Sequence, residues 1–127
     1  MRATPSAPAR ARDAVRHLLI TWDLEPLADT ATLLSSELVT NAVRHAGTRL
    51  EVVVQQLPSG GIRLAVSDAA PGDWPRVNMP GAEDEGGRGM WLVDKLSSSW
   101  GTTTGRRGKS VWFELHLDAI SIEEGAG

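Results

Sequence analysis

The chain has 127 residues, which is enough for one domain with a hydrophobic core and too few for two. No segment approaches the ~20 consecutive apolar residues of a membrane span, and no apolar stretch follows the basic N-terminus, so we expect a soluble protein without a secretory signal or a membrane partner. The absence of cysteine excludes disulfides and thiol chemistry and fits a cytoplasmic protein, while the net charge of −3 argues against a nucleic-acid partner.

An amphipathic helix is predicted at the start of the domain. Residues 1–8 lack an apolar pattern, and we expect them to form a disordered N-terminal lead. Residues 9–22 then carry apolar side chains at helical spacing. The residues on that face are Val15, Leu18, Leu19 and Trp22.

The predicted second helix, which ends near residue 46, contains the most informative motif of the chain. Glu37, Asn41 and His45 follow one another at intervals of four residues, so they share one face of a helix. Leucine, valine and alanine occupy much of the remaining surface, which predicts a helix packed in the core. Such a helix should not carry Glu37 and Asn41 unless they hydrogen-bond, coordinate a ligand or face a cleft. The alternative is a partly solvated helix face with no chemical role.

Two strands joined by a tight turn are predicted next. Residues 49–57 and 62–68 alternate between two faces, and the turn sequence Pro58-Ser59-Gly60-Gly61 separates them. The short turn predicts antiparallel pairing. The second strand ends at Asp68, which is either an acid delivered to a site at the end of the sheet or a residue that bonds the following turn.

A long loop and a glycine-rich helix start follow. Residues 69–88 are rich in proline, glycine and acidic side chains, which is typical of a lid. The sequence Gly86-Gly87-Arg88-Gly89 precedes a helical pattern that begins at Met90. Consecutive glycines let the backbone approach an anion, and the free N–H groups of a helix start point at the same place. The motif therefore predicts a phosphate-binding turn, with an ordinary glycine hinge as the alternative.

The last elements complete an α+β fold. Residues 99–103 and 109–117 predict a second hairpin, and we expect Lys109 and the arginines of its turn to be solvated. Together the elements predict a two-layer sandwich of helices on a mixed, mostly antiparallel sheet. A single domain is expected over residues 9–118, followed by a flexible tail over residues 119–127.

The order of these motifs resembles the Bergerat-type ATP-binding fold of the gyrase and histidine-kinase superfamily. Within it, the chain looks like the actinobacterial branch of the anti-sigma regulatory factors, which are small serine/threonine protein kinases. The resemblance covers roughly residues 10–117. It rests on the segments 36–46, 86–90, 92–93, 100–101 and 108–113.

The resemblance implies a role for each residue of these motifs. Asn41 would bind Mg²⁺ beside the triphosphate of ATP, and Glu37 would be the general base for a serine hydroxyl that attacks the γ-phosphate. Asp68 would accept a hydrogen bond from the 6-amino group of adenine, which favours ATP over GTP. His45 is expected to be structural. The remaining nucleotide contacts would come from Gly87, Arg88, Gly89 and Ser110.

The adenine motif departs from the superfamily pattern at one position. The superfamily commonly has Asp-x-Gly-x-Gly, and this chain keeps the acid as Asp68 and the second glycine as Gly72. Ala70 stands in place of the first glycine, so the backbone near the base is expected to be less free.

As a whole, the resemblance implies an ATP- and Mg²⁺-dependent kinase that phosphorylates a serine of an anti-anti-sigma (STAS-type) protein and sequesters a sigma factor. It also suggests a homodimer. An ATP-binding regulatory module that switches partner binding without kinase activity is the alternative. Glu37 favours the kinase, whereas Ala70 fits the module. A histidine-kinase catalytic module acting in trans is disfavoured, because no phosphoacceptor-histidine helix or sensor segment accompanies the motifs.

Overall fold

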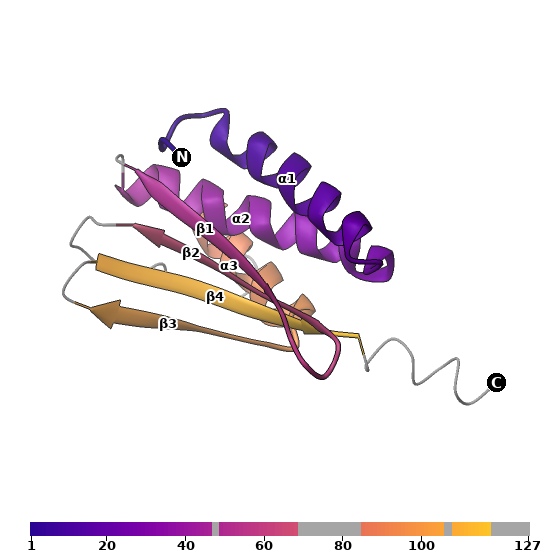
Figure 1. The fold of residues 1–127 in the computed structure, drawn as a ribbon. Coiled ribbons are helices and arrows are strands. Elements are labelled where there is room, and N and C mark those ends of the chain that lie inside the picture. Colours follow the sequence, from indigo (N-terminus) through magenta and orange to yellow (C-terminus); the bar gives the residue numbers. More distant parts are fainter. Residues whose placement is uncertain (47–48, 69–84, 106–107, 118–127) are drawn as a thin grey trace.

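The computed structural model describes residues 1–46, 49–68, 85–105 and 108–117 (Figure 1). Most of the predicted lid, including Ala70 and Gly72, and the predicted tail lie outside these residues. The described residues form one layer of helices against one sheet (Figure 1). Within these ranges, none of the helices is long and apolar enough to cross a membrane.

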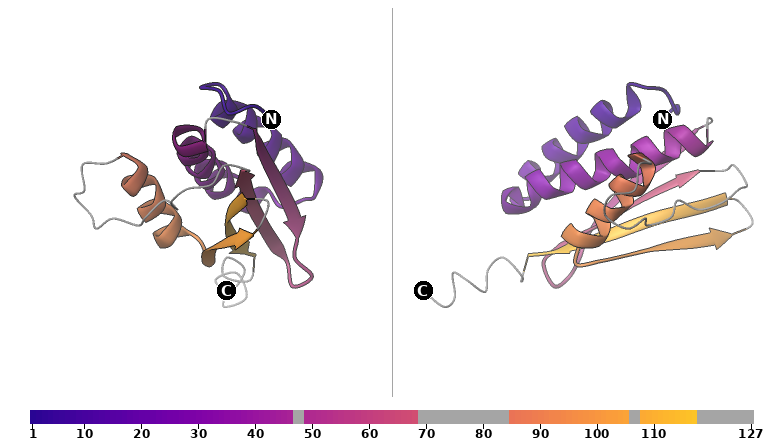
Figure 2. Two further views of the ribbon diagram at one scale, coloured as in Figure 1. Left: turned by 90° about the vertical axis from the view of Figure 1, so that its left-hand side faces the viewer. Right: turned by 180° about the vertical axis from the view of Figure 1, so that it is seen from behind.

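The helices cover a single face of the sheet, and the right-hand view of Figure 2 shows them in front of it. The first helix packs against the second, and the second packs against the third. A short 3₁₀ helix connects the first two. In chain order, the helices are α1 (Ala7–Thr21), η1 (Glu25–Leu27), α2 (Ala28–Ala46) and α3 (Glu85–Leu96).

The sheet has four strands in the order β1-β2-β4-β3, and every pairing is antiparallel. Two hairpins supply the outer pairs, while α3 and β3 carry the chain back so that β4 can lie beside β2. The α+β sandwich is thus confirmed, and the described sheet is built without the parallel pairing that a mixed sheet would include. The strands are β1 (Leu50–Gln56), β2 (Gly61–Asp68), β3 (Ser99–Gly105) and β4 (Gly108–His116).

The two-residue period of the strands separates a helix-facing side from an open side. Val66 and Phe113 are buried on the helix-facing side, where each large apolar side chain contributes about 1.5–3 kcal/mol of burial. The intervening residues, such as Arg63 and Trp112, lie on the open side and are half-buried. Because the period is two, Asp68 shares the helix-facing side with Val66.

The N-terminal residues are attached to the sheet, which differs from the expected disordered lead. The amino group of Met1 donates a hydrogen bond of 2.7 Å to the carbonyl of Leu50, and Arg2 forms an isolated antiparallel bridge with Arg49. Helix α1 also begins earlier than predicted, because a proline in its first turn is pre-organised for a helix start. The N-terminus therefore lies beside the start of β1 (Figures 1 and 2).

Candidate functional site

Helix α2 carries the predicted polar ridge. Leu34, Leu38 and Val39 are buried and fix this helix in the core. Asn41 is only 3% exposed, and Glu37, one turn earlier, is half-buried. A solvated helix face therefore does not account for Asn41. The side chain of His45 lies outside the part of the chain that the structure describes.

The side-chain amide of Asn41 is the strongest indication of a ligand. Its Nδ2 atom is buried and has no hydrogen-bond partner within the described structure. A buried polar group left unpaired costs about 1–3 kcal/mol, and native proteins rarely carry that cost without a reason. An amide presents both a donor and an acceptor, which suits a polyanion and its cation.

The start of α3 lies against the carboxylate of Glu37. A Cβ atom built on Gly89 would be 2.6 Å from Oε2 of Glu37, well inside van der Waals contact. Met90 and Val93 are fully buried, so they anchor α3 in this position. Glycine is thus required at residue 89 for the backbone of α3 to approach the acid on α2.

The glycine-rich motif forms the first turn of α3 rather than a turn before it. The helix begins at Glu85, so Gly87, Arg88 and Gly89 are helical, whereas the sequence predicted a helix from Met90. The first turn of a helix still offers N–H groups without intrahelical partners and the positive end of the helix dipole. The predicted anion-binding chemistry is therefore compatible with this position, and the side chain of Arg88 is not among those described.

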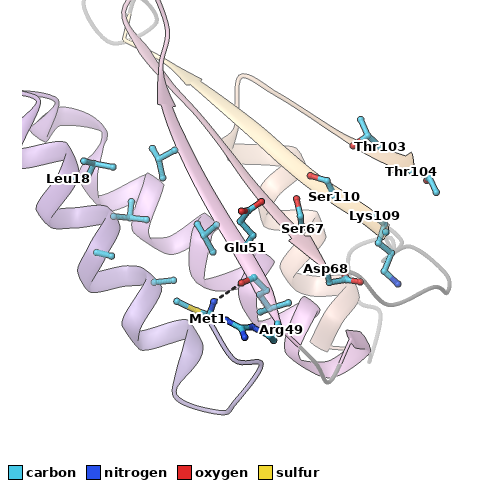
Figure 3. A pocket seen from close by; sticks show the side chains of 17 residues that line it. Met1, Leu18, Arg49, Glu51, Ser67, Asp68, Thr103, Thr104, Lys109 and Ser110 are labelled. Carbon is cyan, nitrogen blue, oxygen red and sulfur yellow. Dashed lines mark hydrogen bonds between the residues drawn. The ribbon is translucent and has the colours of Figure 1, made fainter. Parts of the chain in front are cut away.

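Asp68 lies at the end of β2, opposite Lys109 at the start of β4. Both belong to the helix-facing side, as does Thr104, the partner of Lys109 on β3. Ser110 is the next residue along β4 and pairs with Ser67, so its side chain lies on the open side. Figure 3 shows the side chains of Ser67 and Ser110 directed away from those of Asp68 and Lys109. Ser110 therefore does not share a face with the predicted adenine-binding acid.

Lys109 differs from its predicted environment, because it is buried at 6% exposure instead of solvated in a turn. The signal was present in β4, where Lys109 begins an alternating series that continues through Val111, Phe113 and Leu115. Its place next to a glycine- and arginine-rich turn concealed that period.

A cavity of about 1160 Å³ opens at this end of the sheet (Figure 3). Asp68, Lys109 and Ser110 line it, and it continues between α1 and β1 past Leu18 and Val54. Glu37 and Asn41 do not line it. The predicted site residues thus form two groups, one between α2 and α3 and one at the ends of β2 and β4, and this cavity is lined by the second group.

Helices on one face of an antiparallel sheet, a buried amide on the central helix and a glycine-rich start of the next helix define a histidine kinase-like nucleotide-binding domain. Residues 1–115 match the histidine kinase-like ATPase domain family, and the chain belongs to that family. The coarse assignment is therefore an ATP-binding domain of the kinase and ATPase class.

The individual relatives are matched over only part of their own length. It is 38% identical over 69 residues to an uncharacterised protein of Streptomyces coelicolor, which covers 52% of this chain and 66% of that protein. The histidine kinase domain of the blue-light activated histidine kinase EL346 from Erythrobacter litoralis superposes with a TM-score of 0.60 at 21% identity, covering 91% of this chain and 61% of that one. A second structure of the same kinase gives a TM-score of 0.59 at 24% identity over 77% of this chain and 33% of the other. The chain thus spans less than two thirds of each relative, and the solved structures support the fold.

Proposed function

We propose that the chain is an ATP- and Mg²⁺-dependent protein serine kinase of the anti-sigma type. In this proposal it phosphorylates a serine of an anti-anti-sigma (STAS-type) protein and sequesters a sigma factor. Membership of the histidine kinase-like ATPase family supports nucleotide binding. The observation that carries the proposal is the buried, unpaired amide of Asn41 one helical turn from the acid that contacts the glycine-rich start of α3.

In the proposed complex, Asn41 holds the triphosphate end of ATP. Its Nδ2 would donate to a phosphate oxygen and its Oδ1 would hold Mg²⁺, which would neutralise charge on the phosphates. Among the described residues, no group of three or more acidic, histidine or cysteine side chains gathers to hold a metal. The N–H group of Gly87 adds a donor in the first turn of α3, whereas Gly89, the fifth residue of the helix, lies beyond that turn.

Glu37 is the proposed catalytic residue, because it lies one turn from Asn41 on α2 and its carboxylate lies against Gly89 of α3. Its carboxylate accepts the proton of the substrate serine as the serine oxygen attacks the γ-phosphorus. A bond forms between that oxygen and phosphorus, and the bond from phosphorus to the β–γ bridging oxygen breaks. ADP leaves with the electron pair, and the products are ADP and a phosphoserine.

The test is label transfer with the conservative variant Glu37→Gln. Purified chain, γ-labelled ATP, Mg²⁺ and a set of candidate anti-anti-sigma proteins are combined, and labelled phosphoserine is measured. We expect transfer by the unmodified chain and a loss of about 100-fold in Glu37→Gln. The affinity for ATP should change less than threefold, because the carboxylate acts in the transfer step.

Glu25→Gln is the matched control, since Glu25 is an exposed acid of η1 that does not line the cavity at the end of the sheet. It should transfer label at the rate of the unmodified chain. If the unmodified chain binds the nucleotide but neither it nor the two variants transfer label, the kinase proposal is overturned. The chain would then be a nucleotide-dependent binding module. Equal transfer rates for Glu37→Gln and the unmodified chain would show that Glu37 is not the general base.

A further inference from the structure

Lys109 is a charged residue placed where charge is costly. It is 6% exposed as the second residue of β4, and a buried ammonium group must have an opposite charge or a ligand beside it. Asp68 lies directly opposite it in the strand register, on the same side of the sheet. Facing residues of antiparallel strands have Cβ atoms about 4.5–5.5 Å apart, which brings the two side chains within reach of each other.

The pair is open to a ligand, because both residues line the cavity at the end of the sheet. Figure 3 shows their side chains next to each other at this end. A carboxylate only accepts hydrogen bonds, and an ammonium group only donates them. Asp68 and Lys109 therefore present an acceptor and a donor side by side to whatever occupies this part of the cavity.

We infer that Lys109 is a second residue that reads the nucleotide base. The inference rests on the proposed function, in which Asp68 accepts from the 6-amino group of adenine. Next to that amino group, adenine carries an acceptor, the ring nitrogen N1. The ammonium group of Lys109 donates to N1 while Asp68 binds the amino group, so the two side chains match two adjacent atoms of the base.

In the orientation that adenine adopts, guanine and hypoxanthine are mismatched to the pair at both positions. Their 6-oxygen is an acceptor that faces the carboxylate of Asp68, and their N1–H is a donor that faces Lys109. Sites with buried polar groups discriminate strongly when those groups are left unpaired. Lys109 thus adds a second mismatch to the one that Asp68 alone provides.

The test removes one atom from the ligand and one charge from the protein. Calorimetric titrations with Mg·ADP and with Mg·1-deaza-ADP, in which C–H replaces N1, are made on the unmodified chain and on Lys109→Met. The unmodified chain should bind 1-deaza-ADP at least tenfold more weakly than ADP. Lys109→Met should bind ADP at least tenfold more weakly and should bind the two ligands within twofold of each other.

Lys95→Met is the matched control, because Lys95 is exposed on α3 and should behave as the unmodified chain does. If Lys109→Met loses affinity for both ligands by the same factor, Lys109 is only the counter-ion of Asp68 and the inference is overturned. Equal binding of both ligands by the unmodified chain overturns it without using a variant. Failure of the unmodified chain to bind either ligand overturns the proposed function itself.

Discussion

Asn41 is buried on the central helix with its Nδ2 atom unpaired, although a leucine of similar size would fit an apolar neighbourhood without that cost. Retention of such a group is typical of functional sites, where stability is given up for binding. At Gly89 it is the absence of a side chain that matters, because the carboxylate of Glu37 fills the space that a side chain would occupy. Asn41 and Gly89 are thus the neighbours of Glu37 on α2 and at the start of α3.

Gly89→Ala separates stability from catalysis at this contact. Alanine favours a helix over glycine by about 0.5–1 kcal/mol, and the atom in its way is the mobile end of Glu37. We expect an unfolding temperature that is equal or slightly higher and a phosphotransfer rate at least tenfold lower, because the carboxylate is displaced. Thermal unfolding and label transfer measure the two quantities, with Lys95→Ala on the same helix as control. An unchanged transfer rate would contradict the close contact.

The side chains of strand β4 alternate between the two sides of the sheet, and the two sides differ in chemical character. Its helix-facing residues are the core residues and Lys109, while its open side carries a polar cluster around Trp112. The guanidinium of Arg63 lies 3.9 Å from the ring centroid of Trp112 and 3.0 Å from Oε2 of Glu114. The Nε2 atom of His116 is 2.9 Å from Oε1 of the same carboxylate. This cluster connects β2 to β4 on the open side of the sheet.

The cluster gives the fold a contribution that depends on pH. A hydrogen bond from His116, aided by Arg63, lowers the pKa of Glu114 below its ordinary value of 4.5. The contribution is therefore complete above pH 4.5 and is lost as the pH falls through the lower folded-state pKa. We expect Glu114→Gln to reduce the free energy of unfolding by up to about 1 kcal/mol at neutral pH.

Urea unfolding of both proteins between pH 5 and pH 3 checks this expectation. The difference between the unmodified chain and Glu114→Gln should shrink as the pH falls over this range. Glu51→Gln removes an exposed carboxylate from the same side of the sheet and controls for the general effect of charge. A difference that stays constant down to pH 3 would exclude Glu114 as its source.

The type of each described α-helix and strand could be predicted from the sequence, because apolar periodicity is strong in α1, α2 and the strands, whereas the short helix η1 was not predicted. The start of α3 could not, since Gly86 and Gly87 disfavour a helix and only packing at Met90 and Val93 compensates for them. Glu37 and Asn41 were found because a polar pair interrupts an apolar helix. Lys109 was missed because its burial follows from strand register, which a sequence pattern alone does not reveal.

At the scale of the whole molecule, the proposed site is assembled from segments far apart in the chain. Helix α2 and the start of α3 belong to the layer of helices, and the ends of β2 and β4 at the site belong to the sheet beneath it (Figure 1). The sheet order β1-β2-β4-β3 brings β2 next to β4, so the acid and the lysine meet only when the fold is complete. Nucleotide binding and folding should therefore be coupled, because a ligand bound by the native state alone stabilises it.

Calorimetric titration of Mg·ATP into the folded chain and into Asn41→Ala tests the central claim most directly. We predict saturable binding by the unmodified chain and a loss of at least 100-fold in affinity in the variant, with circular dichroism showing that both remain folded. No binding heat from the well-folded unmodified chain, or unchanged affinity in Asn41→Ala, would contradict the assignment of the α2–α3 site to nucleotide binding.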